Sequence, residues 1–274
     1  MSTKIVRLNS ILTAIMLFLY AGCGILNFML SLLRNSALNY STISLPSGVF
    51  LCLAVMLPTV VLLIYGIKQV KQKQGKADLI FSIPTLIVSV IWIVLAVLNW
   101  GITLARSVII ELYYRMDIAM SLADLLTLLS YLNVAYMLFT TIIALYLLVI
   151  YLIRVLCTKQ KWLQIKAELH KPAAAVLILV PNLLSFVSTF LNPIFNRMGT
   201  DALIKFSQIY LYISFGITTL LSIALAVFVL VFGLIIKKRP AAKAQASKAA
   251  AQPSQEKPAD LPFNVPAGVN ADDL

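Results

Sequence analysis

The residues that could do chemistry inside the long apolar runs of this sequence are neutral asparagines. Asn27, Asn99 and Asn192 each follow a leucine near one end of an apolar run, and Asn133 lies in the first half of another. An amide in hydrocarbon must find a hydrogen-bond partner, so such residues either join helices to one another or bind a polar solute. If they face one cavity, they predict a site for a neutral solute, with Asp124 near its rim.

Groups suited to catalysis or metal binding are almost absent from the same runs. Ionisable side chains within a membrane usually mark ion paths or active sites, and the interiors of these runs contain almost none. His170, the only histidine, lies in a lysine-rich connection and is predicted to be a surface residue. The three cysteines give neither a disulfide framework nor the spacing of metal ligands. We therefore expect no enzymatic activity, no catalytic residue, no cofactor and no metal site.

The composition predicts that the asparagines are carried by membrane helices. Hydrophobic residues make up 61% of the 274-residue chain and charged residues 12%, whereas ordinary domains are about 45–50% apolar and about 25% charged. A membrane helix needs about 20 mostly apolar residues. The expected fold is an all-α, multi-pass bundle of six transmembrane helices, paired as three hairpins. Their expected ranges are 8–33, 48–67, 79–105, 122–153, 173–195 and 207–236.

The distribution of charge predicts the orientation of the bundle. If the N-terminus is cytoplasmic, 17 of the 22 lysines and arginines fall in the inner segments. This alternation is the positive-inside pattern, and it places both termini in the cytoplasm. The net charge of +12 is therefore explained by lysines and arginines that orient the helices at the inner surface of the lipid bilayer. We do not expect a nucleic-acid partner.

Two inner segments are candidates for contact with a protein partner. In the connection 158–171, Trp162, Ile165 and Leu169 fall on one helical face, with lysines mostly on the others. Such a short amphipathic helix suits either the surface of an anionic membrane or a docking partner. The tail 237–274 is rich in alanine, proline and small polar residues. It is expected to be a disordered cytoplasmic appendage.

One outer connection is expected to be an interfacial turn. The segment 106–124 connects the third apolar run to the start of the fourth and contains Tyr113 and Tyr114. Tyrosine rings are favoured at the level of the lipid headgroups. The alternative is that this segment forms the mouth of a path for a solute.

Two functions fit these observations. The favoured one is a non-enzymatic accessory or partner-binding subunit of a membrane complex, because the runs lack the buried carboxylates that couple transport to ions. The alternative is a small transporter or channel for a neutral or weakly polar solute, with an outward-facing cavity lined by asparagines. The absence of disulfide-bearing loops and of strong glycosylation signals favours the cytoplasmic membrane of a bacterium as the location.

Overall fold

Every regular element in the described part of the chain is an α-helix. The computed structural model describes residues 2–32, 41–72, 77–116, 119–157 and 162–235. Six of its helices are long and apolar enough to cross a membrane, which confirms the predicted fold class and number of spans. The predicted tail, 237–274, lies outside the described residues. The helices are α1 (Thr3–Leu32), α2 (Ser41–Lys71), α3 (Ala77–Met116), α4 (Ala119–Cys157), α5 (Trp162–Ala167), α6 (His170–Arg197) and α7 (Thr200–Leu234).

The helices extend beyond the apolar runs that predict them. α2 begins at Ser41 and α7 at Thr200, each about two turns earlier than expected. α3 has 40 residues and continues to Met116 through the segment expected to be an interfacial turn. Hydropathy locates only the part of a helix that lies in hydrocarbon, whereas the backbone hydrogen bonds continue until a breaker intervenes. The segment 106–116 contains neither glycine nor proline.

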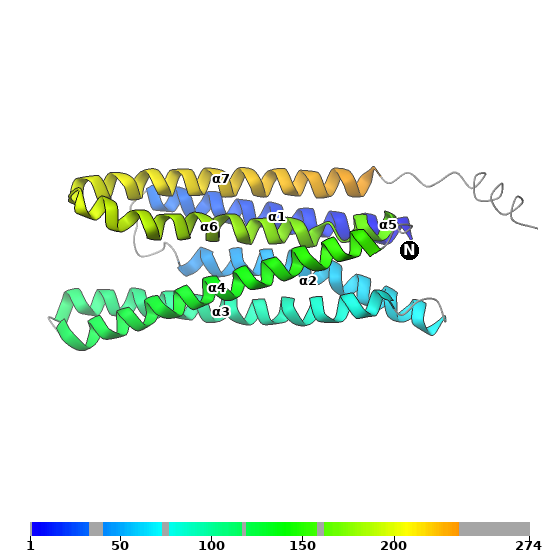
Figure 1. Cartoon of the computed structure of the whole chain (residues 1–274), viewed down its shortest axis with the longest axis horizontal. Helices are drawn as coiled ribbons and strands as arrows, with labels where there is room; N and C mark the ends of the chain where they lie inside the picture. The colour runs from blue at the N-terminus through cyan, green and yellow to red at the C-terminus, as the bar shows by residue number, and fades with distance from the viewer. Residues whose placement is uncertain (1, 33–40, 73–76, 117–118, 158–161, 236–274) are drawn as a thin grey trace, which may run out of the picture. The chain divides into compact units, whose positions relative to one another are not determined.

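The six long helices form a closed ring. Each packs against the next long helix along the chain, α7 packs against α1, and α2 also touches α6 across the middle. Figure 1 shows them running side by side along one direction. We call the end that holds Thr3, Lys71 and Cys157 the inner end, following the charge prediction, and the end that holds Leu32 and Met116 the outer end. The cytoplasmic location of the termini and the pairing into three hairpins stay predictions.

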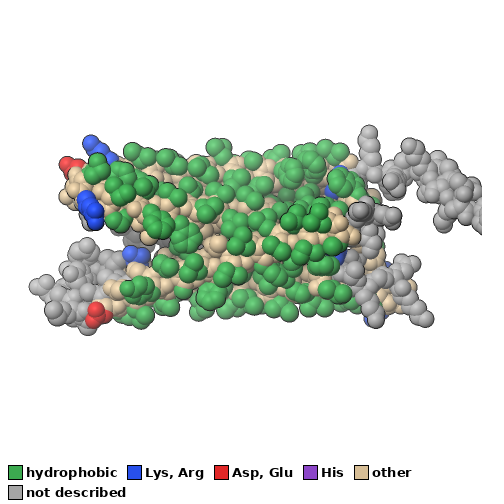
Figure 2. Space-filling model, in the orientation of Figure 1, with side chains coloured by type: hydrophobic (Ala, Val, Ile, Leu, Met, Phe, Trp, Pro, Cys, Tyr) green, Lys and Arg blue, Asp and Glu red, His purple; other side chains and the backbone are tan. Residues whose placement is uncertain are grey.

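The side of the bundle is apolar over most of its length. Figure 2 shows hydrophobic side chains covering the face in view, with the coloured lysine, arginine, aspartate and glutamate side chains at the two ends. Large side chains such as Phe190 and Leu220 are exposed by 76% and 71%. Water would not stabilise such a surface, and lipid would. These features indicate a multi-pass integral membrane protein.

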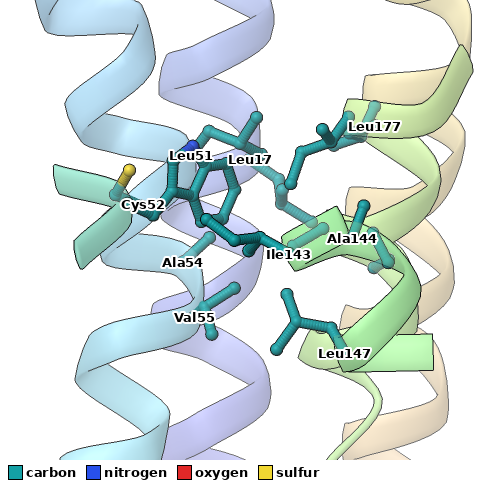
Figure 3. Close-up of a cluster of buried hydrophobic side chains, with 14 of the residues drawn as sticks. Leu17, Leu51, Cys52, Ala54, Val55, Ile143, Ala144, Leu147 and Leu177 are labelled. Carbon is teal, nitrogen blue, oxygen red and sulfur yellow. The ribbon is translucent and has the colours of Figure 1, made fainter. Parts of the chain in front are cut away.

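The middle of the ring is filled by an apolar core. Leu17 of α1, Leu51 and Val55 of α2, Leu147 of α4 and Leu177 of α6 point toward one another there (Figure 3). Burial from water drives little association between helices in lipid, so close packing must hold them together. Small residues permit that close approach, and the core contains the buried alanines Ala54, Ala96, Ala144, Ala173, Ala174, Ala175 and Ala226.

A glycine allows a second close approach nearer the inner end. Gly233 of α7 is buried against Ser10 of α1, and a Cβ atom at this position would overlap the Oγ and Cβ atoms of that serine. The Ser10 hydroxyl donates to the carbonyl of Val6 in its own helix, so it adds no unpaired donor to the contact. Glycine at position 233 therefore lets α1 and α7 meet and closes the ring.

Candidate solute-binding cavity

A cavity of about 620 Å³ lies between the core and the outer end. All six long helices contribute to its lining. On α1 the core uses Leu17, whereas the cavity uses residues up to Phe28, nearer the outer end. Leu51, Leu177 and Ile178 belong to both the core and the lining, so they form the floor. Figure 2 shows the surface hollowed at this end, between α6–α7 and α3–α4. The volume is typical of a site for a small molecule.

The described lining of the cavity is polar and uncharged. It contains four asparagines, Asn27, Asn99, Asn133 and Asn182, and none of its described residues is acidic, basic or a histidine. Aromatic rings come from Phe28, Trp92 and Phe215, among others. Hydroxyl groups come from Tyr20, Ser47, Tyr136, Thr140, Ser185, Tyr210, Ser214, Thr218, Thr219 and Ser222.

The cavity brings together three of the five residues predicted to bind a solute. Asn27, Asn99 and Asn133 line it, although solute binding itself stays a prediction. Asn192 and Asp124 are exposed and do not line it. Successive helical residues turn by about 100°, so Asp124, nine positions before Asn133, lies on the opposite side of α4. Leucine–asparagine pairs near helix ends in the sequence therefore mark a depth in the membrane but no common face.

The fourth asparagine of the cavity, Asn182, was missed. Its Nδ2 donates to the Oγ1 of Thr141 at 2.8 Å, to the Oγ1 of Thr140 at 3.2 Å and to the carbonyl of Met137 at 3.3 Å. These bonds join α6 to α4 and fix the orientation of the amide. A signal was present in the sequence, because Asn182 directly follows Pro181, which interrupts helical hydrogen bonding within a span.

The other three amides are open to a ligand. The side chains of Asn27, Asn99 and Asn133 make no hydrogen bond with the part of the chain that the structure describes. The Oδ1 of Asn99 is buried, so it has neither a protein donor there nor solvent. A buried acceptor without a donor costs about 1–3 kcal/mol. A polar molecule in the cavity could remove that cost only if the Asn99 amide turns toward it.

A second polar site, on the inner side of the core, buries ionisable residues that lie just outside the predicted spans. Glu168 lies between two cations, with its Oε1 3.3 Å from the Nε of Arg154 and its Oε2 3.2 Å from the Nζ of Lys171. All three residues are at most 3% exposed. The Arg154 guanidinium also lies over the ring of Phe81, 4.8 Å from its centroid. We call Arg154, Glu168 and Lys171 the inner ionic cluster.

His170 lies beside this cluster, and its prediction as a surface residue is wrong. It is 1% exposed. Its Nε2 lies 3.3 Å from the Oγ1 of Thr59 on α2, and its Nδ1 lies 3.1 Å from the carbonyl of Ala167. Helix α5 packs at the inner end of the bundle, where Ala167 joins Val6 and Leu62 in a small apolar cluster. The many lysines of the connection 158–171 predict solvent exposure, but among its described residues, 162–171, all except Trp162 are buried or half-buried.

The same packing changes the interpretation of the short amphipathic segment. Of the three residues predicted to face a membrane surface or a partner, only Trp162 is largely exposed, at 64%. Ile165 and Leu169 are half-buried, and Leu169 packs against the core. Gln164 and Ala167 are buried. Helix α5 is thus docked on its own chain, and contact of this segment with a membrane surface or a partner stays a prediction.

Comparison of the chain with known protein families, with characterised proteins and with solved structures gave no match. The functional assignment therefore rests on the geometry and chemistry of the cavity and of the inner ionic cluster.

Proposed function

We propose that this protein binds a small neutral polar solute in the cavity and carries it across the membrane. The observation that supports this proposal best is the cavity itself, which has four asparagines and no charged side chain among its described lining residues. Its depth within the bundle and its volume of about 620 Å³ suit a solute rather than a protein segment. An uncharged site also agrees with the absence of buried carboxylates for ion coupling among the described residues on the outer side of the core.

The floor of the cavity favours a carrier over a channel. Leu51, Leu177 and Ile178 separate the cavity from the inner end, so a solute that enters from outside stops at the core. Passage then requires the helices to rearrange around the bound solute, as in alternating access. Pro58 and Pro181 remove helical hydrogen bonds within α2 and α6, at the levels of the inner polar site and of the cavity. Both positions are suited to helix bending.

An accessory-subunit function is the second candidate. The exposed Trp162 supports it, because a large aromatic side chain on a docked helix can anchor a partner protein. The structure gives the accessory hypothesis less support than the sequence does, because Ile165 and Leu169 of the predicted contact face are half-buried in the protein itself.

Uptake into liposomes by the purified protein alone separates these two functions. We expect saturable uptake of at least one neutral solute among labelled glucose, myo-inositol, uridine and urea, and no uptake by protein-free liposomes. A carrier requires no second protein, so the activity should survive purification to homogeneity. If the purified protein moves none of these solutes, and crosslinking in native membranes joins a stoichiometric partner to Trp162, the accessory function replaces the carrier.

A further inference from the structure

We propose that the solute is polyhydroxylated, of the monosaccharide or cyclic polyol class, and that Asn27, Asn99 and Asn133 bind its hydroxyl groups. This inference rests on the proposed function and names the substrate class of the same cavity. Three properties of the lining support it: acceptors that lack donors, amides that need both donors and acceptors, and two phenylalanine rings that are stacked on each other.

The cavity first requires a ligand rich in hydrogen-bond donors. The Oδ1 of Asn99 accepts no hydrogen bond from the described residues and is covered from solvent, so a ligand donor reaches it once the amide turns toward the cavity. The amide nitrogen of Asn182 is held by α4, so its Oδ1 is the end left for a ligand. Pro181 has no N–H, so the carbonyl of Leu177 lacks its usual helical donor, and both of these residues line the cavity. Ketones, ethers and other donor-poor solutes do not meet this need.

The free amides also require acceptors from the same ligand. Each of Asn27 and Asn133 offers a carbonyl oxygen and an NH₂ group that make no hydrogen bond with the described residues. A hydroxyl is a small neutral group that both donates and accepts, so two adjacent hydroxyls match the two ends of one amide. A charged solute would lose its hydration without gaining an opposite charge, since no described lining residue is charged.

The aromatic rings argue against a flat heterocycle. The rings of Phe28 and Phe215 are stacked on each other, with centroids 3.9 Å apart and planes 7° apart, and Tyr212 meets Phe28 edge-on at 5.7 Å. No gap for a nucleobase remains between the stacked pair. Trp92 is only 3% exposed. The small C–H faces of a sugar or polyol need less ring surface than a planar base does.

Cys23 provides a natural reporter of ligand in the cavity. It lines the cavity one helical turn from Asn27, whereas Cys52 is fully buried in the core and Cys157 is exposed at the inner end. In a Cys52→Ala, Cys157→Ser variant of the full chain, Cys23 is the sole thiol. The experiment measures the rate at which a maleimide alkylates Cys23 with each of several added probes. These are myo-inositol, glucose, glucose 6-phosphate, glucosamine, choline, uridine and cyclohexanol.

We expect glucose or myo-inositol to slow alkylation by about fivefold at a concentration four times its Kd, because the reactive, unliganded fraction equals 1/(1 + [L]/Kd). The charged, planar and apolar probes should have no effect. Protection should vanish in the Asn99→Leu, Asn133→Leu background and persist with Asn192→Leu, which changes an exposed residue outside the cavity.

Two results would overturn the inference, and they differ in what else they remove. If uridine or choline protects Cys23 and the polyols do not, the cavity binds solutes but the substrate class is wrong. If no probe protects Cys23 and the purified protein takes up none of the tested solutes, the carrier function fails together with the substrate class.

Discussion

Replacing Glu168 with glutamine is expected to destabilise the protein by about 3–5 kcal/mol, because removal of one partner leaves buried charges uncompensated. Glu168 is the acid that both Arg154 and Lys171 contact, at 3.3 and 3.2 Å. Glutamine keeps the size of the side chain and removes its charge, so the two cations would face each other inside the bundle. The midpoint of thermal unfolding in detergent, followed by size-exclusion chromatography, measures the change.

Two further variants separate the loss of charge compensation from a packing effect. Glu168→Gln combined with Lys171→Met restores the net charge of the inner ionic cluster and should recover part of the lost stability. Asp201→Asn makes the same chemical change at an exposed position in the first turn of α7 and should lower stability by at most about 1 kcal/mol. A double variant no more stable than Glu168→Gln alone would show that charge pairing does not hold this end of the bundle together.

The variant Asn99→Leu, Asn133→Leu is expected to lose solute uptake while keeping its fold. Each substitution removes ligand hydrogen bonds worth about 1–2 kcal/mol, so binding should weaken roughly 30- to 1,000-fold. Neither amide bonds to the described protein, and the Oδ1 of Asn99 is buried without a donor. Stability should therefore stay level or rise. Uptake into liposomes and thermal unfolding, measured on the same preparation, test both parts.

The matched controls for this variant are Asn192→Leu and Asp124→Asn, which change exposed residues outside the cavity. Both should transport at the wild-type rate. If the Asn99, Asn133 variant unfolds at a clearly lower temperature and its folded fraction still transports, the asparagines join helices and do not bind the solute.

The number of spans was predictable because it depends on length and hydropathy, which are local. The convergence of Asn27, Asn99 and Asn133 on one cavity was only partly predictable. Leucine–asparagine pairs near the ends of apolar runs indicate the depth of each asparagine in the membrane, but not the face of the helix on which it lies. Asn192 has a suitable depth and is nevertheless exposed. Asn182, nearer the middle of α6, takes its place in the lining. Which faces meet depends on how the helices rotate against one another, and side-chain packing across the whole ring sets that rotation.

The inner ionic cluster escaped prediction for a different physical reason. A basic residue at the inner end of a span has the same sequence signature whether it reaches the lipid headgroups or an acid within the protein. The sequence therefore predicts membrane anchors at Arg154 and Lys171 and a surface residue at His170. The one distinguishing sign is Glu168, the lone acid in the lysine-rich segment 158–171. It has two cationic partners: Lys171, three residues later, and Arg154 of α4, which only the folded chain brings close to it.

The accessibility of Cys23 tests the central claim, a polar cavity that opens to the outside, most directly. In intact cells that carry the variant with Cys23 as its sole thiol, a membrane-impermeant maleimide should label the protein. A variant in which Cys157 is the sole thiol should be labelled only after the membrane is permeabilised, since this residue is exposed at the inner end. If Cys23 reacts only after permeabilisation, or not at all in folded protein, the cavity does not open to the outside and the proposed outward-facing carrier is wrong.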